Sequence, residues 1–357
     1  VENLGRGVLA LRTGDSSVYV GWRLLGTDPA GLGFNLYRST DGAAAVKLNA
    51  SPLEATTDYV DNSADSARSH AYHVRPVLEG VELTASGSAT VAAGAPVLPY
   101  LNVLLQRPAG GNVEVPVGNP TQAATYSPND ASAADLDGDG EYEIVLKWDP
   151  SNARDNASAG LAGRQLIDAY KLDGTLLWRI DLGRNIRAGA HYTQFMVYDL
   201  DGDGRAEVAM KTADGTIDGA GNVIGDASKD YRSLLVANDG IQVPATNDAR
   251  YGKVLAGPEY FTVFDGLTGR ALATTDYIAG REPIGGWGGM GGNGNSDANG
   301  NRGDRFLAAV AYLDGNLPSV IMARGYYGRS VLAAYDYRRD ASDNGQLTTR
   351  WVFDSGV

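Results

Sequence analysis

The chain has 357 residues, of which 43% are hydrophobic and 20% charged, so it can bury a core and suggests about two domains. Its formal net charge of −13 argues against nucleic acid as a partner, because phosphate binding needs a clustered basic surface. The absence of cysteine excludes disulfides and thiol chemistry. No apolar run approaches the roughly 18–20 residues that span a bilayer, so no membrane partner is expected.

Residues 1 to about 93 alternate between short strand-like runs and turn signals such as Thr13-Gly14-Asp15. This spacing predicts a small β-sandwich with an aromatic core of Trp22, Tyr37, Tyr59 and Tyr72. Two of the runs are similar to a fibronectin type III pattern, although an unrelated sandwich stays open. The strand-like runs are 8–11, 18–24, 34–38, 70–77 and 81–85. Small residues and proline at 92–99 predict a linker, and hence two domains, 1–93 and 100–357.

The strongest signal in the second domain is an acidic stretch that occurs twice, at 135–143 and 199–207. Each copy has carboxylates at its positions 1, 3, 5 and 9, glycines at 4 and 6, and a position-7 carbonyl that can point inward. This pattern is typical of a Ca²⁺ loop, with solvated acidic turns as the alternative. The predicted ligands are Asp135, Asp137, Asp139, Glu141 and Glu143 in the first copy, and Asp199, Asp201, Asp203, Arg205 and Glu207 in the second.

Each acidic stretch continues into a strand-like run, 143–147 or 207–211, so it is predicted to lie in a β-hairpin. A third, degenerate copy at 311–324 has Tyr312, Asn316 and Val320 at ligand positions and is expected to bind no calcium. A repeated unit of four short strands predicts the blades of a β-propeller. Propellers close with about four to eight blades, so we expect further blades outside this chain. The glycine-rich stretch 285–303 fits a rim loop or a disordered linker.

The segment 185–195 carries the residues best suited to proton transfer. His191 is the only histidine outside the first domain, and Arg187 and Tyr192 lie beside it in sequence. This cluster is a candidate for proton transfer and anion binding. The alternative is a histidine that is hydrogen-bonded within the core.

Three cations end corresponding strand-like runs. Lys147 and Lys211 follow the two acidic loops, and Arg324 ends the degenerate copy. At one repeat position they would form a basic ring near one mouth of a propeller channel, suited to an anionic chain. Alternatively, the lysines pair with nearby Asp149 and Asp214.

Longer motifs resemble the rhamnogalacturonan lyases of polysaccharide lyase family 11, and the resemblance extends over essentially the whole chain. These motifs are 135–152, 168–183, 185–195, 211–216, 257–260 and 322–327. The resemblance implies an all-β fold, in which a fibronectin type III-like sandwich precedes an eight-bladed calcium-rich propeller. It also implies cleavage of the rhamnose–galacturonic acid backbone of pectin by a secreted enzyme. Family members are longer than this chain, and the resemblance implies that their further blades supply part of the substrate cleft.

The implied reaction is β-elimination, in which the uronate carboxylate is neutralised, a base removes the carbon-5 proton and the carbon-4 oxygen leaves. We expect Arg187, Lys211 and Arg324 to neutralise the negative charge of the uronate carboxylate. We expect His191 or Tyr192 to transfer the proton. Further predicted contacts to rhamnogalacturonan I come from Lys147, Asn152 and Tyr326. We expect a monomeric endolyase, although the sequence does not distinguish endo from exo action. The alternative function is a non-enzymatic, calcium-stabilised propeller that binds carbohydrate or protein.

Overall fold

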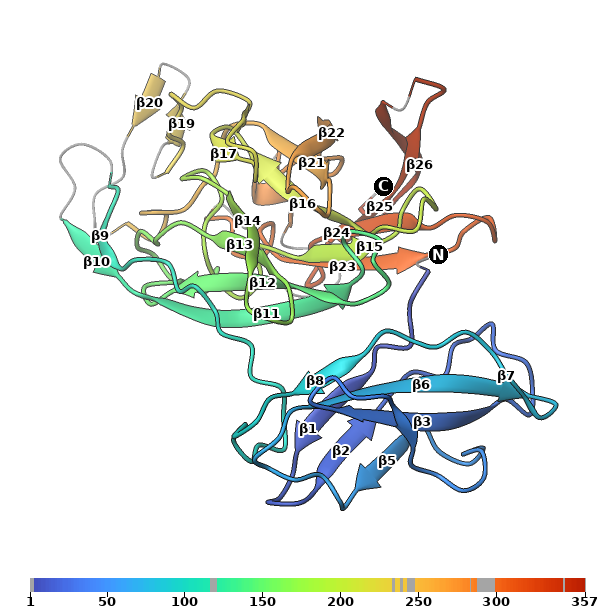
Figure 1. The fold of residues 1–357 in the computed structure, drawn as a ribbon. Helices are drawn as coiled ribbons and strands as arrows, with labels where there is room; N and C mark the ends of the chain where they lie inside the picture. The colour runs from blue at the N-terminus through green and yellow to red at the C-terminus, as the bar shows by residue number, and fades with distance from the viewer. Residues whose placement is uncertain are drawn as a thin grey trace. The chain divides into compact units, whose positions relative to one another are not determined.

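A computed structural model describes residues 3–115, 121–232, 235–237, 240–242, 248–282, 284–287, 299–342 and 344–356. The fold of these residues is all-β, with a single 3-10 turn, η1 (Ile284–Trp287) (Figure 1). The chain divides into two compact units. The smaller unit comprises Glu2–Leu104 and Gly138–Tyr142, and the larger comprises Leu105–Asp137 and Glu143–Val357.

The smaller unit consists of two antiparallel sheets that share one hydrophobic cluster. One sheet has the order β1–β2–β5, and the other has β4–β3–β6–β7 with β8 paired to β6. The strands are β1 (Leu9–Arg12), β2 (Val18–Gly21), β3 (Gly33–Thr40), β4 (Val46–Lys47), β5 (Asp58–Asp61), β6 (His70–Leu78), β7 (Val81–Glu82) and β8 (Ala89–Val91).

The aromatic core of this unit matches the prediction in part. Trp22 and Tyr72 are buried in the cluster and Tyr59 packs against it. Tyr37 lies outside it, and the prediction for this residue is wrong. Because side chains alternate along a strand, Tyr37 shares the outer face with its paired residue His73, on which it stacks at 5.2 Å.

The larger unit contains three four-stranded antiparallel sets whose strands follow one another along the sheet. They are β11 (Tyr126–Ala134), β12 (Glu143–Pro150), β13 (Leu166–Tyr170) and β14 (Leu176–Asp181); β15 (Phe195–Tyr198), β16 (Glu207–Ala213), β21 (Glu259–Phe264) and β22 (Ala271–Asp276); and β23 (Phe306–Ala311), β24 (Ser319–Arg324), β25 (Val331–Arg339) and β26 (Gly345–Asp354). The predicted strands after the acidic loops are confirmed as β12 and β16. The first strands of the sets are neighbours, since β15 contacts both β11 and β23.

Shorter strands complete this unit. The first sheet is extended by two of them, and two separate pairs form small ribbons. The extending strands are β17 (Thr216–Ile217) and β18 (Val223–Ile224), and the ribbons are β9 (Gly111–Val113) with β10 (Gln122–Ala124) and β19 (Leu235–Ala237) with β20 (Gly240–Gln242). Most of the predicted glycine-rich loop, residues 288–298, lies outside the described residues. No helix among the described residues has the length and apolar character to cross a membrane.

Strand β16 of the middle sheet is buried on both faces, and its sequence shows why. Along β16 the side chains of Val208 and Met210 join a hydrophobic cluster with Val145 of the first sheet. Ala209, which points the other way, joins a second cluster with Met322 of the third sheet. Each large apolar side chain buried in this way contributes about 1.5–3 kcal/mol. A strand that packs against sheets on both sides has no polar face, and any charge on it must find a partner inside the fold.

Candidate functional site

The second acidic loop, between β15 and β16, brings three carboxylates together. Oxygens of Asp199, Asp201 and Asp203 lie within 4.8 Å of one another. Backbone amides of the loop hold Asp199, with Gly202 N donating at 2.7 Å and Gly204 N at 3.2 Å. These two glycines have backbone φ angles of 85° and 96°, which residues other than glycine rarely adopt. The predicted turn therefore does position its carboxylates around one point.

The first acidic loop, between β11 and β12, has a similar arrangement. Oxygens of Asp135, Asp137 and Glu143 also lie within 4.8 Å of one another. The predicted ligands Asp139 and Glu141 fall in the segment that groups with the smaller unit, where Glu141 N donates to Asp139 Oδ1 at 2.9 Å. In the larger unit, the loop thus offers three carboxylates to one ion.

The last acidic residue of each loop is buried in the same way. Glu143 accepts a hydrogen bond from Leu136 N, and Glu207 accepts one from Leu200 N, both at 2.8 Å. Burial, together with the negative charge of Asp201 and its neighbours, raises the pKa of Glu207 to about 9. Burial and the nearby carboxylates thus disfavour the charged form of Glu207, and a cation bound beside it would favour that form.

The residues present fit Ca²⁺, because a group of carboxylate oxygens is the ligand set that this ion prefers. One basic side chain also faces each loop. Lys171 Nζ lies 2.6 Å from Asp137, and Arg339 bonds to Asp201. The side chain of Arg205 pairs with a carboxylate of its own loop, so the expected ligand role of its backbone carbonyl stays a prediction.

A second group of charges is buried between the middle and third sheets, and we call it the Glu259 cluster. Glu259 accepts hydrogen bonds from Lys211 at 2.7 Å, Arg281 at 2.8 Å and Arg324 at 2.5 Å. Arg324 also donates to Asp304 at 3.0 Å. Burial by itself would raise the pKa of Glu259, but these three cations outweigh it and hold the pKa well below its usual range. The predicted catalytic residues Lys211 and Arg324 therefore use their donors inside the fold.

Strand register explains why Lys211 and Arg324 face one another. In each acidic hairpin, eight residues lie between the last paired residues of the two strands, at 135–142 and 199–206. In the third hairpin only seven residues lie between them, at 312–318. Successive residues of a strand point to opposite faces, so a difference of one residue places Arg324 on the opposite face from the lysine position. The predicted ring of three equivalent cations is wrong. Ser319, not Val320, pairs at the position of Glu143 and Glu207.

Lys147 and Asn152 have structural contacts of their own. Lys147 is buried on β12 and its Nζ lies 2.6 Å from an Asp130 carboxylate oxygen. Both lysines are thus paired with carboxylates, as the alternative interpretation held, but their partners are not the predicted Asp149 and Asp214. Asn152 Oδ1 accepts a hydrogen bond from a loop amide at 2.8 Å. Contacts of these residues with substrate stay predictions.

Arg187 and Tyr192 are both buried and bind one another. Arg187 donates to Tyr192 Oη at 2.7 Å, to Ser158 O at 2.7 Å and to Gly160 O at 2.8 Å. Burial raises the pKa of Tyr192, so its hydroxyl keeps its proton at neutral pH. The hydrogen bonds of Arg187 connect the loop after β12 to the segment before β15. For the predicted catalytic roles, a substrate would have to reach these two side chains, and this packing covers them.

His191 and Tyr326 are the predicted site residues that meet at the surface. Their Nδ1 and Oη atoms lie 3.3 Å apart. Asp155 Oδ2 is 3.6 Å from His191 Nε2, and the Arg305 guanidinium is 5.9 Å from the centre of the Tyr326 ring. Burial and the charge of Arg305 lower the pKa of His191, while Asp155 opposes them. The imidazole is therefore neutral at pH 7 and able to accept a proton.

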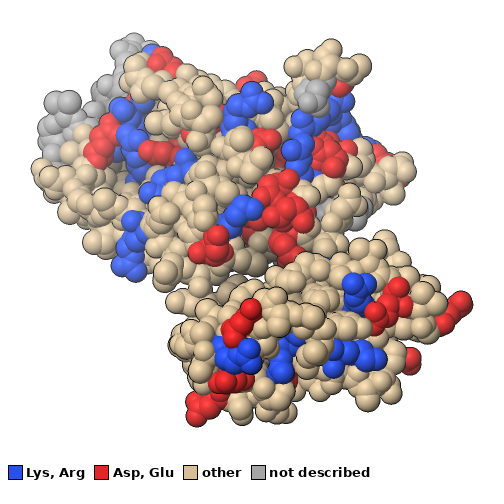
Figure 2. Space-filling view, in the orientation of Figure 1, with Lys and Arg blue, Asp and Glu red and all other residues tan. Residues whose placement is uncertain are grey.

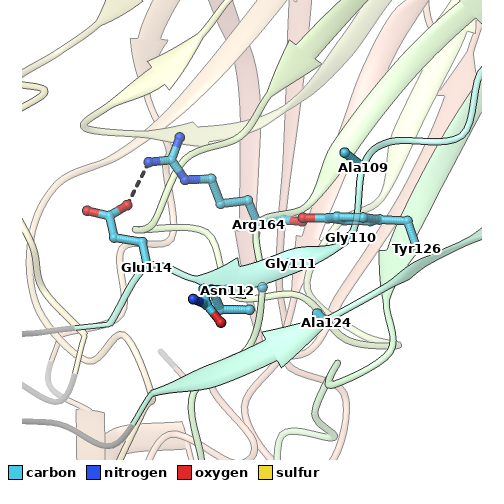
Figure 3. Close-up of a pocket in the computed structure, with 10 residues that line it drawn as sticks. Ala109, Gly110, Gly111, Asn112, Glu114, Ala124, Tyr126 and Arg164 are labelled. Atoms are coloured by element: carbon cyan, nitrogen blue, oxygen red, sulfur yellow. Dashed lines mark hydrogen bonds and ion pairs between the residues drawn. The ribbon is translucent and has the colours of Figure 1, made fainter.

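Sequence reasoning did not identify the pocket in Figure 3, which has a volume of about 220 Å³. Its wall includes the backbone of residues 109–113, the Tyr126 ring and Arg164. Arg164 pairs with Glu114 at 2.6 Å, marked by the dashed line, and with Asp181 at 2.6 Å. No local motif marks this pocket because Arg164 and Glu114 are 50 residues apart in sequence. On the visible face of the larger unit, basic and acidic side chains similarly lie next to one another (Figure 2).

Family comparisons match both parts of the chain. The "Rhamnogalacturonan I lyases beta-sheet domain" matches residues 1–92, and "Rhamnogalacturonan lyase family 11, C-terminal domain" matches residues 100–357. Together the two matches cover nearly the whole chain, and both family models describe rhamnogalacturonan lyases. The chain belongs to rhamnogalacturonan lyase family 11, which confirms the resemblance carried by its motifs.

Two curated relatives from Bacillus subtilis (strain 168) are each 51% identical to this chain: the rhamnogalacturonan endolyase YesW over 355 residues and the rhamnogalacturonan exolyase YesX over 357. Each alignment covers 99% of this chain and 50% of the relative, so the chain spans about half the length of these relatives. The crystal structure of YesX has a TM-score of 0.82 at 50% identity, covering 99% of this chain and 51% of that one. The Bacillus licheniformis lyase has 0.80 at 50% identity, with 99% and 53% covered. Because the endolyase and the exolyase are equally similar, identity does not decide between the two modes of action.

Proposed function

We propose that this chain acts in a secreted, calcium-dependent rhamnogalacturonan lyase that cleaves the rhamnose–galacturonic acid backbone of pectin by β-elimination. In this proposal the smaller unit is a fibronectin type III-like sandwich, and the three four-stranded sets are blades of a propeller. The protein acts as a monomer on rhamnogalacturonan I. Membership of the lyase family supports the reaction class, and the two acidic loops support the calcium requirement.

One observation carries the catalytic part of the proposal. His191 is a neutral imidazole at the surface, beside the Tyr326 hydroxyl and the positive charge of Arg305. Among the predicted residues for proton transfer, His191 has a partly exposed side chain, whereas Tyr192 is buried. A solvent-accessible imidazole that is neutral at pH 7 can accept a carbon-bound proton when the neighbouring uronate carboxylate is neutralised.

The elimination itself can be followed atom by atom. His191 accepts the carbon-5 proton of the uronate, the electrons of that bond form the carbon-4 to carbon-5 double bond, and the bond from carbon 4 to its oxygen breaks. The leaving oxygen takes a proton, for which the Tyr326 hydroxyl, 3.3 Å from His191 Nδ1, is in position to serve as donor. Arg187, Lys211 and Arg324, which we expected to meet the carboxylate, support the site from inside the fold.

Calcium, when bound in the acidic loops, would neutralise their carboxylates and stabilise the hairpins β11–β12 and β15–β16. The protein residues hold the loops in place for it. Asp199 is fixed by two loop amides, and Glu143 and Glu207 by one each.

The test is the ultraviolet absorbance of de-esterified rhamnogalacturonan incubated with the protein, with calcium or with a chelator. We expect absorbance to rise only with calcium, since elimination creates an unsaturated uronate. His191→Gln should lower the rate by about 100-fold or more, while His73→Gln, in the smaller unit, should not change it. A calcium-independent rise would contradict the calcium requirement.

An alternative function is a non-enzymatic propeller that binds carbohydrate or protein and is stabilised by calcium. The observation in its favour is that Lys211 and Arg324, two expected catalytic cations, are both engaged by Glu259. If no absorbance develops under any condition while the polysaccharide still binds, this alternative replaces the lyase.

A further inference from the structure

Two adjacent tyrosines are presented to solvent directly after β24. Tyr326 is 39% exposed and Tyr327 47% exposed, and their ring centres lie 5.3 Å apart with the planes inclined by 31°. The turn that presents them starts at Gly325, whose φ angle is 71°. A Cβ at this glycine would lie 2.9 Å from the Trp287 side chain, so the turn depends on glycine. Large aromatic side chains are usually buried, and an exposed adjacent pair is therefore a candidate binding surface.

A cation lies behind these rings. The Arg305 guanidinium is 4.9 Å from the centre of the Tyr327 ring and 5.9 Å from that of Tyr326. Arg305 is only 8% exposed and is held by Asn301, with Nε donating to the backbone oxygen at 3.1 Å and Nη2 to Oδ1 at 3.0 Å. Nη1 makes a long contact of 3.5 Å with Tyr326 Oη. The guanidinium has further N–H groups, and among the described residues these have no hydrogen-bond partner.

Polar groups border the rings on one side. His191 contacts Tyr326 edge-on, with ring centres 6.4 Å apart, and Asp155 lies 3.6 Å from His191 and 4.0 Å from Arg305. These residues come from the loop after β12, the segment before β15, the position before β23 and the turn after β24. A flat aromatic surface bordered by hydrogen-bonding groups suits a ring-shaped, hydroxylated ligand.

We propose that Arg305, Tyr326 and Tyr327, together with the edge of His191, form a binding subsite for a uronic acid residue of the polysaccharide. A pyranose ring can stack its C–H face on the exposed tyrosines, and its carboxylate can reach the N–H groups of Arg305 that make no hydrogen bond among the described residues. A guanidinium is always charged and presents its N–H groups in a fork that matches a carboxylate. The choice of galacturonate as this ligand rests on the proposed function.

Binding to rhamnogalacturonan oligosaccharides, measured by isothermal titration calorimetry with chelator present, tests the stacking surface. We expect Tyr327→Ala to weaken binding by about tenfold. Tyr312→Ala is the matched control, since Tyr312 is 41% exposed and also contacts a second tyrosine, Tyr198, edge-on at 6.2 Å. Wild-type affinity in Tyr327→Ala, equal losses in both variants, or no binding by the wild type at millimolar oligosaccharide would overturn the proposal.

The carboxylate contact is tested from the ligand side, so that folding of a variant does not enter. Oligosaccharides whose uronate carboxyl groups have been reduced to alcohols should bind the wild type about tenfold more weakly than the native oligosaccharides. In Arg305→Gln the two ligands should bind equally, provided that its circular dichroism is that of the wild type. Equal binding of both ligands by the wild type would show that Arg305 does not recognise the carboxylate.

These measurements separate the subsite from the lyase reaction. Binding that depends on Tyr327, in a protein that forms no unsaturated product, would leave the subsite standing and remove the proposed reaction. Product formation by the wild type, together with unchanged binding in Tyr327→Ala, would leave the proposed reaction standing and remove the subsite.

Discussion

The Glu259 cluster and the surface group around His191 are built from similar residues but have different consequences. In the Glu259 cluster, Lys211, Arg281 and Arg324 direct their donors to one buried carboxylate. Beside His191, Arg305 is held by Asn301, lies 4.0 Å from the half-exposed Asp155 carboxylate, and keeps N–H groups that make no hydrogen bond among the described residues. The first arrangement joins two sheets, and the second leaves hydrogen-bonding capacity for a ligand.

Burial of the carboxylate partner accounts for this difference: the Glu259 side chain is 4% exposed and that of Asp155 47%, whereas the side chains of Lys211 and Arg305 are 7% and 10% exposed. A charge taken out of water loses several kcal/mol of hydration, so it is tolerated only where opposite charges and hydrogen bonds replace that hydration. At the surface, water hydrates whatever the protein leaves unpaired, and a ligand can displace that water. The type of a charged residue therefore does not indicate whether it stabilises the fold or binds a substrate. The second acidic loop is intermediate, because Glu207 is buried beside the carboxylates of Asp201, Asp203 and Asp199.

The largest expected effect is on the Glu259 cluster. Glu259→Gln leaves Lys211, Arg281 and Arg324 buried with one carboxylate, Asp304, nearby, and should reduce the free energy of unfolding by about 3–5 kcal/mol at pH 7. Because the pKa of Glu259 is lowered in the folded protein, its contribution is present above the ordinary pKa and is lost as pH falls through the folded value. Urea denaturation at pH 7 measures the loss of unfolding free energy in Glu259→Gln. The same measurement at acid pH shows whether the contribution of Glu259 is lost there.

The control for this prediction is Asp41→Asn, which removes an exposed carboxylate from its pair with Arg68. The urea midpoint of this variant should stay that of the wild type, since exposed ion pairs stabilise little. If Glu259→Gln unfolds at the same urea concentration as Asp41→Asn, burial does not distinguish the two regions in the way described.

A smaller effect is expected from calcium. Calcium at about 100 times its dissociation constant should stabilise the protein by roughly 2–3 kcal/mol, seen as a rise in melting temperature that a chelator reverses. Asp199→Asn should reduce this rise, since Asp199 belongs to one of the two carboxylate groups. Asp314→Asn in the degenerate third loop is the matched control and should leave the rise unchanged. An equal loss in both variants would mean that the acidic loops are not the calcium sites.

The smallest effect concerns the titration of His191. Its imidazole should titrate below the ordinary histidine pKa of about 6.5, because burial and Arg305 disfavour its charged form. Asp155→Asn removes the opposing charge and should lower the midpoint further, whereas Arg305→Gln should raise it. Nuclear magnetic resonance can follow this, since the chain has only three histidines and His191→Gln identifies the signal. A midpoint above 6.5 in the wild type would place His191 among carboxylates rather than beside Arg305.

The prediction of the acidic loops and their strands succeeded because each is local in sequence. The spacing of carboxylates and glycines in 135–143 and 199–207 is enough to place them on a turn, and β12 and β16 begin where the sequence indicates. The repeat also indicated the four-stranded sets. His191 and Tyr326 were chosen separately, and the structure brings them within 3.3 Å.

What only the tertiary structure decided depends on contacts between distant residues. Glu259 is 48 residues from Lys211 and 65 from Arg324, so no local pattern connects the three. The third loop is one residue shorter between its paired strand ends, and that single residue turns Arg324 toward the middle sheet. Sequence alone thus determined which turns can hold a cation, since their geometry is set by neighbouring residues. The packing of sheets determined which charges are buried and which can meet a ligand, because hydration is lost only when another sheet covers the side chain.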